Sequence, residues 1–225
     1  MANILLKRKV LELRKLGKSY GQIRKELGVS KSTLSVWLRK YPLNREQIRI
    51  LKDENEDRIE KFRETMRLKR ERRLQIYYKE MQKEVLPFSQ KELFLAGVFL
   101  YWGEGGKTER GQVTISNTDP TVIKFSLHWM IHALKIPKEK IKIVLHLYQD
   151  MVIDSEIEYW STALHIPKSQ FAKPYIKKSR RIDIDEKGYG HGTCNLRVCD
   201  TVLKEKIIEA IKVVADYSDG YIQKL

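Results

Sequence analysis

Apolar residues recur at three- and four-residue steps through the first 85 positions, which is the spacing of helices that bury one face. Within residues 3–40 this pattern is interrupted by Gly17 and Gly28, so three short helices are predicted. Residues 44–85 contain neither glycine nor proline and carry a thin apolar stripe, which predicts one long helix or two joined helices. Pro87 then marks a boundary, after which the pattern of apolar and polar residues changes.

The second and third N-terminal helices have clear end signals. Ser19 and Gln22 have the spacing of a capping box that opens the second helix, and Gly28 should end it. The third helix is expected over residues 31–40. It should turn its apolar residues toward the second helix and leave polar residues outside: inward Leu34, Trp37 and Leu38, outward Lys31, Ser32, Ser35 and Arg39.

From residue 88 onward, helical stretches and strand-like alternation are interleaved, which predicts an α+β domain. Residues 93–102 are apolar almost all round a helix, so we expect this helix to be buried on every side. The remaining pattern predicts strands over residues 112–117, 141–148, 181–185 and 193–199, and helices over residues 119–134, 155–164 and 201–214.

The excess positive charge lies mostly in the N-terminal part. The chain of 225 residues has a formal charge of +15, and residues 1–90 hold 24 basic and 12 acidic side chains, against 20 and 17 in the remainder. Charge concentrated in one segment indicates a polyanionic partner, of which a nucleic acid is the most common. A solvated basic face that serves solubility is the alternative.

Other classes of protein are excluded by what the sequence lacks. The longest apolar run covers ten positions, well short of the roughly 20 that cross a bilayer, and no signal-peptide core is present. We therefore expect an intracellular protein without a membrane partner. Cys194 and Cys199 should point to opposite faces of one strand, which disfavours a disulfide or a shared metal.

The capped helix, the glycine turn and the polar-faced third helix closely resemble the helix-turn-helix DNA-binding domains of transposases, recombinases and bacterial regulators. The resemblance implies a DNA-binding domain over residues 1–42, followed by a basic helical linker over residues 43–87. It implies DNA contacts from the outer part of the third helix: Lys31, Ser32, Thr33, Ser35 and Arg39. The alternative is a helical hairpin used for protein contact, but residues 1–42 carry a net charge of +9, which favours DNA.

The stretch Leu-Ala-Gly-Val-Phe-Leu-Tyr-Trp-Gly-Glu-Gly-Gly, residues 95–106, is the most informative in the chain. An apolar helix that ends in Gly-Glu-Gly carries one carboxylate, Glu104, at its C-terminal end. The negative end of the helix dipole and the apolar surroundings both disfavour a lone carboxylate there. A cation is therefore expected to compensate the charge.

These residues resemble the motif of the LAGLIDADG homing endonucleases. The resemblance implies a domain of that type over residues 88–225 with mixed α/β structure and an antiparallel sheet. In that family two such helices pack side by side, and each ends in an acid that binds a divalent metal over the scissile phosphate. Glu104 would be both the catalytic and the metal-binding acid, with Mg²⁺ or another divalent cation as cofactor.

The match to that motif is partial and occurs once. The family's first acid would fall at Trp102, and Leu-Ala-Gly stands two residues too early relative to Gly-Glu-Gly. Because there is one copy, a site with two acids requires a homodimer, which predicts cleavage of both strands of double-stranded DNA. Polar residues on the predicted strands should face the DNA as in the family: Gln112, Thr114, Thr193, Asn195 and Arg197. An amphipathic strand is also commonly just a solvated one.

The leading hypothesis is therefore a homodimeric, metal-dependent DNA endonuclease of the homing type. The alternative is a non-catalytic DNA-binding regulator built on the same domains, because relatives of such enzymes have lost cleavage. A transposase or recombinase would need a multi-acid or nucleophilic site, and the sequence does not provide one.

Overall fold

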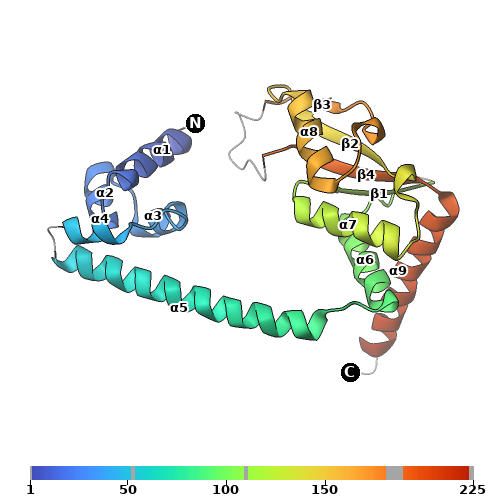
Figure 1. Ribbon diagram of the computed structural model, residues 1–225, viewed down its shortest axis with the longest axis horizontal. Helices are drawn as coiled ribbons and strands as arrows, with labels where there is room; N and C mark the ends of the chain where they lie inside the picture. Colours follow the sequence, from blue (N-terminus) through green and yellow to red (C-terminus); the bar gives the residue numbers. More distant parts are fainter. Residues whose placement is uncertain (1, 52–53, 109–110, 181–189, 223–225) are drawn as a thin grey trace. The chain divides into compact units, whose positions relative to one another are not determined.

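The structure is a computed structural model that describes residues 2–51, 54–108, 111–180 and 190–222 (Figure 1). The chain divides into two compact units, Met1–Pro87 and Phe88–Leu225, which we call unit 1 and unit 2. Unit 1 is helical and unit 2 combines helices with a four-stranded sheet, so the chain is α+β as predicted. Among the helices of the described ranges, none is long and apolar enough to cross a membrane.

Unit 1 begins with three short helices that share a core. They are α1 (Ala2–Lys15), α2 (Tyr20–Leu27) and α3 (Lys31–Trp37). The capping box of Ser19 and Gln22 is confirmed, and Gly28 ends α2 in the left-handed conformation that favours glycine. Of the residues predicted to face inward from the third helix, Leu34 and Leu38 are buried in this core and Trp37 packs against it partly buried. The other buried residues of the core are Val10, Tyr20, Ile23 and Val29.

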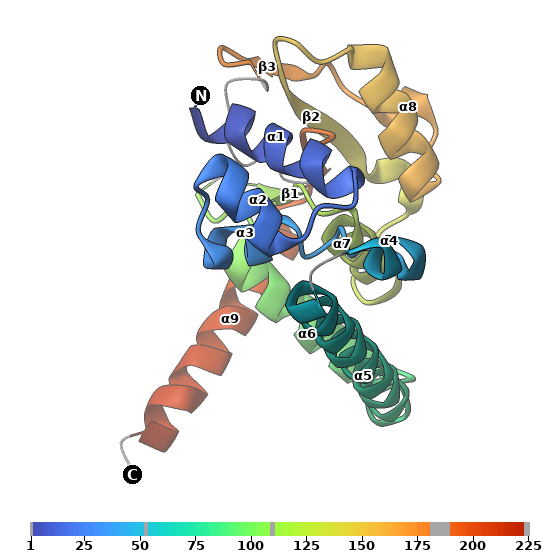
Figure 2. The same ribbon diagram turned by 90° about the vertical axis from the view of Figure 1, so that its left-hand side faces the viewer.

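Residues 44–85 form two helices, α4 (Arg45–Ile50) and α5 (Glu54–Val85). Asn44 caps α4 through a second capping box with Gln47, which explains why the chain starts a new helix here. With 32 residues, α5 is about 48 Å long at 1.5 Å per residue. Figure 1 shows α1, α2 and α3 gathered at the N-terminal end of α5, and Figure 2 views these helices from that side.

A buried ion pair attaches α5 to the three short helices. Arg14 of α1 donates from its two terminal nitrogens to Glu60 of α5, at 3.3 and 3.0 Å, and both side chains are almost fully buried. Arg63 donates to the same carboxylate at 2.7 Å, and its guanidinium lies over the ring of Tyr20, 3.9 Å from the centroid. Burial raises the pKa of Tyr20 and the two guanidinium groups oppose that rise. The first part of α5 is therefore structurally one piece with the N-terminal helices.

The sheet of unit 2 has the order β1-β4-β2-β3, with β1 (Gln112–Asn117), β2 (Lys142–Tyr148), β3 (Tyr175–Lys177) and β4 (Thr193–Cys199). The expected antiparallel sheet is wrong for one pair: β1 and β2 are antiparallel to β4, but β3 is parallel to β2. The physical reason is the connection, since a helix crosses over between β2 and β3 and returns the chain in the same direction. The strand expected over residues 181–185 lies outside the described residues.

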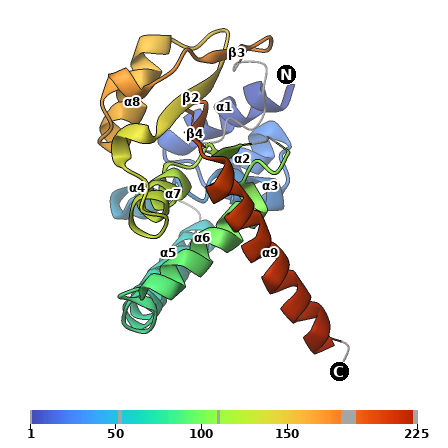
Figure 3. The same cartoon turned by 90° about the vertical axis from the view of Figure 1, so that its right-hand side faces the viewer.

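The described residues of unit 2 also form four helices: α6 (Gln90–Glu104), α7 (Pro120–His132), α8 (Ile153–Leu164) and α9 (Thr201–Ile222). Two short 3-10 turns, Lys138–Lys140 and Lys168–Gln170, follow α7 and α8. Compared with the prediction, α8 starts two residues earlier without a side-chain cap, and α9 continues eight residues further. Figure 3 shows the second half of α9 extending beyond the sheet.

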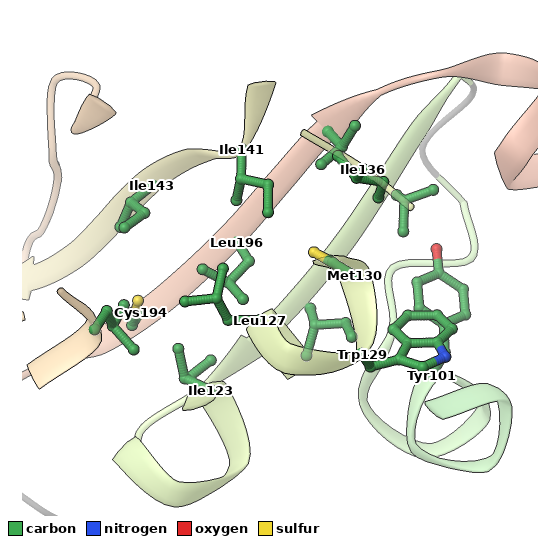
Figure 4. Packing of buried hydrophobic residues seen from close by; sticks show 14 of the residues in the cluster. Tyr101, Ile123, Leu127, Trp129, Met130, Ile136, Ile141, Ile143, Cys194 and Leu196 are labelled. Atoms are coloured by element: carbon green, nitrogen blue, oxygen red, sulfur yellow. The ribbon is translucent and has the colours of Figure 1, made fainter. Parts of the chain in front are cut away.

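The core of unit 2 lies between the apolar face of the sheet and these helices (Figure 4). Side chains from all four helices contribute, including Tyr101 of α6, Trp129 of α7, Trp160 of α8 and Ile207 of α9. They meet alternate residues of the strands: Val113, Ile115, Ile143, Leu145, Leu147, Cys194, Leu196 and Val198. Cys194 is buried on this face, whereas Cys199, five residues along the same strand, is exposed; both thiols are free.

Candidate functional site

Helix α6 has one apolar face that the described residues of unit 2 leave exposed. Ser89 and Glu92 form the predicted capping box at its start, and Leu93, Val98 and Tyr101 are buried. The prediction that α6 is buried on every side is wrong, because Phe99 and Trp102 are 51% and 39% exposed. Their rings stack on the surface with centroids 6.5 Å apart. The two rings therefore form an exposed apolar surface on this face of α6.

Two glycines of α6 lie in opposite environments. A Cβ added at Gly97 would stand 2.0 Å from the indole of Trp129, so α6 and α7 pack too closely here for any side chain. The Trp129 indole nitrogen also donates to the carbonyl of Phe94 at 3.2 Å, which fixes the ring. A Cβ added at Gly103 would meet nothing within 4 Å. Nothing within the described protomer therefore requires a glycine at position 103.

Glu104 is the last residue of α6 and its side chain is exposed. The two residues that follow attach this end of the helix to the edge of the sheet. Gly105 forms a bridge with Ile115, and the Gly106 N–H donates to the Thr114 carbonyl at 2.9 Å. Within the described ranges Glu104 has no ion pair, and no group of three or more His, Cys, Asp or Glu side chains is placed to hold a metal. Among the described residues, Glu104 is thus a lone exposed carboxylate at this end of α6.

A buried lysine supports the turn behind Glu104, and sequence reasoning missed it. Lys204 of α9 is 6% exposed and donates to the Tyr101 hydroxyl at 2.5 Å and to the Gly106 carbonyl. The Tyr101 hydroxyl in turn donates to Gly106 at 2.7 Å. The available signal was its spacing, since Lys204 lies three and seven residues before the buried Ile207 and Ile211. The polar contacts around Gly106 hold the end of α6 in place.

The predicted polar face of the sheet is present, and the strand register brings its residues together. Thr114 of β1 pairs with Arg197 of β4, which pairs with Lys142 of β2. Gln112 and Thr193 lie at the two ends of the same face and are partly buried.

The centre of this polar face is less open than an amphipathic pattern suggests. Thr114 is 3% and Asn195 is 5% exposed. Two of its polar atoms, Asn195 Oδ1 and Arg197 Nε, are buried without a hydrogen-bond partner in the described part of the chain. Buried polar atoms without partners are uncommon and commonly mark the place of a missing ligand or water.

The candidates on α3 belong to unit 1 and are arranged as a polar outer face. Lys31, Ser32, Ser35 and Arg39 are exposed, as expected. Thr33 differs, because its hydroxyl lies 2.8 Å from Ser30 Oγ within the cap of α3 and is half-buried. Its role in the protomer is to help start α3.

Three groups of side chains thus stand out: the end of α6 with Glu104, the polar face of the sheet, and the outer face of α3. The first two lie in unit 2 and share strand β1 through Gly105 and Gly106. Comparisons of the chain with protein-family models, with curated proteins and with solved structures found no match.

Proposed function

We propose that this protein is a site-specific DNA-binding protein that acts as a homodimeric, metal-dependent endonuclease of the LAGLIDADG type. The observation that carries the proposal is the open face of α6, which is apolar, contains a glycine with free space around it, and ends in the exposed Glu104. A second copy of the same helix would cover this face. The pairing would also bring two Glu104 carboxylates together.

Helix pairing through Gly103 is supported by the packing chemistry of α6. Glycine lets two helix backbones approach closely, and Gly103 has no such neighbour within the described part of its own protomer. Phe99 lies one turn before Gly103 on the same open face, so its ring would be buried against a partner helix. A two-fold interface uses the same surface of both subunits, so one exposed helix in each chain is enough to form it.

Two Glu104 carboxylates, one from each chain of the proposed dimer, would supply oxygen ligands that suit a divalent cation. Two carboxylates held close together repel each other, and a hard cation such as Mg²⁺, which takes oxygen ligands, relieves this repulsion. When bound, the metal would activate water and neutralise charge on a phosphate. The chain's own contribution is positional, because Tyr101 and Lys204 fix the Gly106 turn beside Glu104.

Two surfaces support DNA as the substrate. On the sheet, Gln112, Thr193 and Arg197 are partly exposed, and amide and guanidinium groups are the side chains that read base edges in the major groove. In unit 1, α3 presents lysine, serine and arginine side chains on one exposed face. The strongly basic N-terminal region, residues 1–90, would add attraction to phosphates.

A non-catalytic DNA-binding regulator is the second candidate. The feature that favours it is Trp102, which stands where the family motif has its first acid, so each protomer contributes one carboxylate. The same dimer would then bind DNA and leave both strands intact.

One experiment separates the two candidates, and it identifies the target sequence as its first step. The full-length Glu104→Gln variant is used to select tightly bound duplexes from a random-sequence DNA library. The wild-type chain and a matched Glu205→Gln control, altered at an exposed carboxylate of α9, are then incubated with the selected duplexes and Mg²⁺. The proposal expects double-strand cuts by both proteins and none by Glu104→Gln. Selection without cutting would favour the regulator, and failure to select any sequence would contradict both.

A further inference from the structure

Unit 1 contains a strongly basic groove of about 620 Å³ between α3 and α5. Ser35 of α3, with Leu38 and Arg39 just beyond its end, lines one side, and the basic stretch of α5 lines the other. Seven basic side chains line the groove against two carboxylates, Glu60 and Glu64. The seven are Arg14, Arg39, Arg63, Arg67, Lys69, Arg70 and Arg73. We propose that this groove holds the phosphodiester backbone of the DNA duplex whose bases α3 contacts; this inference rests on the proposed DNA binding.

The two carboxylates are engaged in ion pairs at the inner end of the groove. Glu60 accepts from both Arg14 and Arg63, so one negative charge faces two positive ones. Glu64 pairs with Arg45 of α4 at 3.6 Å. The negative charges thus hold α5 against the short helices, and the outer part of the groove keeps its basic character.

The outer part of the groove presents a row of cations. Arg67, Arg70 and Arg73 follow one another at three-residue steps, which keeps them on one face of α5, over about 9 Å of helix axis. Within the described ranges no carboxylate forms an ion pair with Arg39, Lys69, Arg70 or Arg73. Arg67 pairs with Glu71 at 2.9 Å, yet its Nε is buried without a partner among the described residues.

This arrangement suits a phosphate backbone in both spacing and chemistry. Phosphates along one strand of a duplex follow at about 3.4 Å of axis per nucleotide, so 9 Å corresponds to two or three of them. Arginine binds phosphate oxygens through paired N–H groups, and four of the outer cations are arginines. Because Ser35 and Arg39 of the α3 outer face line the same groove, a duplex lying against α3 would bring one strand to α5. Binding of an acidic protein segment would not require Ser35 and Arg39 to line the same groove as the basic residues of α5.

The test compares two double variants that each remove two positive charges from α5. Arg70→Gln with Arg73→Gln changes the groove, and Arg72→Gln with Lys79→Gln changes exposed residues that do not line it. Binding of a fluorescent 24-bp duplex of mixed sequence to the full chain is measured by anisotropy at several KCl concentrations. Each phosphate contact contributes about 0.9 to the slope of log K against log salt. We expect the groove variant to lower the slope by about 1.8, and the control, which removes no phosphate contact, to leave the slope unchanged by the same relation.

The possible outcomes of this test bear separately on the groove, on the kind of partner and on the nuclease activity. Equal slopes for the two double variants would overturn the groove and show that only overall charge matters. A wild-type chain without affinity for the duplex, together with tight binding of a polyglutamate peptide, would overturn it in favour of an acidic protein partner. A lowered slope in the groove variant supports the groove even if the wild-type chain cuts no DNA, which would reject the nuclease alone.

Discussion

Replacing Gly97 by alanine should destabilise unit 2 far more than the same replacement at Gly103 of the same helix. The new Cβ would lie 2.0 Å from Trp129, whose indole is fully buried and donates to Phe94, so the ring or the helix must move by about 1.5 Å. Overpacking of this kind costs about 3 kcal/mol, and loss of the indole hydrogen bond adds about 1 kcal/mol. The better helix propensity of alanine returns about 1 kcal/mol. We expect a net loss of about 3 kcal/mol in the free energy of unfolding.

Urea unfolding of the full chain, followed by tryptophan fluorescence, measures this loss. Two of the four tryptophans, Trp129 and Trp160, are fully buried in unit 2 and report its unfolding. Gly103→Ala is the matched control, because it adds the same methyl group to the same helix where nothing lies within 4 Å. At a protein concentration low enough to keep the chain monomeric, the control should stay within about 1 kcal/mol of wild type. A Gly97→Ala variant as stable as that control would refute the close packing of α6 on α7.

Three further predictions concern buried polar groups and thiols. Tyr101→Phe should lower the stability of unit 2 by about 1–3 kcal/mol in urea unfolding, because it removes a hydroxyl bonded to Lys204 and Gly106; an unchanged midpoint would contradict the role of that hydroxyl. Glu60→Gln should lower the free energy of unfolding of unit 1, followed by circular dichroism, by about 3–5 kcal/mol, because Arg14 stays buried without a counter-charge. The exposed Glu71→Gln should change this free energy little, and similar losses for the two variants would refute the role of the buried ion pair. In the native protein, Cys199 should react with Ellman's reagent, whereas Cys194 should react only after denaturant is added, because it is buried and burial raises its pKa. Two fast-reacting thiols in the native protein would show that Cys194 is accessible.

Local signals in the sequence predict the helices best where a cap and an apolar face coincide. Ser19 with Gln22 and Ser89 with Glu92 form the expected capping boxes, and Leu34 and Leu38 are buried as predicted. These features depend on residues three or four positions apart, which a sequence displays directly. The predicted start of α8 is two residues late because the helix has no side-chain cap to mark it.

Features that depend on distant partners are not visible in the sequence. Strand β3 has only three residues and owes its existence to pairing with β2, so its own sequence carries too little alternation. The pair of Arg14 and Glu60 joins residues 46 positions apart, and each residue alone looks like a solvated charge. Lys204 is buried through its contacts with α6, about a hundred positions earlier in the chain.

The candidate site shows the same difference between features that local sequence reveals and features that depend on distant partners. The sequence indicates Glu104 at the end of an apolar helix, and the structure places it there with an exposed side chain. An all-round apolar helix is predicted to be buried within the protomer, but apolar periodicity shows only that a surface avoids water. It does not show whether the covering surface belongs to the same chain, and Phe99 and Trp102 remain exposed here.

Pairing of α6 with a second α6 is tested most directly by cross-linking at Gly103. A Gly103→Cys variant is made with Cys199→Ser, which removes the exposed native thiol, and a Lys124→Cys variant on the exposed side of α7 is the control in the same background. A disulfide forms when two Cα atoms approach within about 4.4–6.8 Å, which closely paired helices achieve at a glycine position. After mild oxidation, a non-reducing gel should show a covalent dimer for Gly103→Cys and monomer for Lys124→Cys. Monomer for both, with both new thiols reactive, would contradict the shared site of two Glu104 carboxylates.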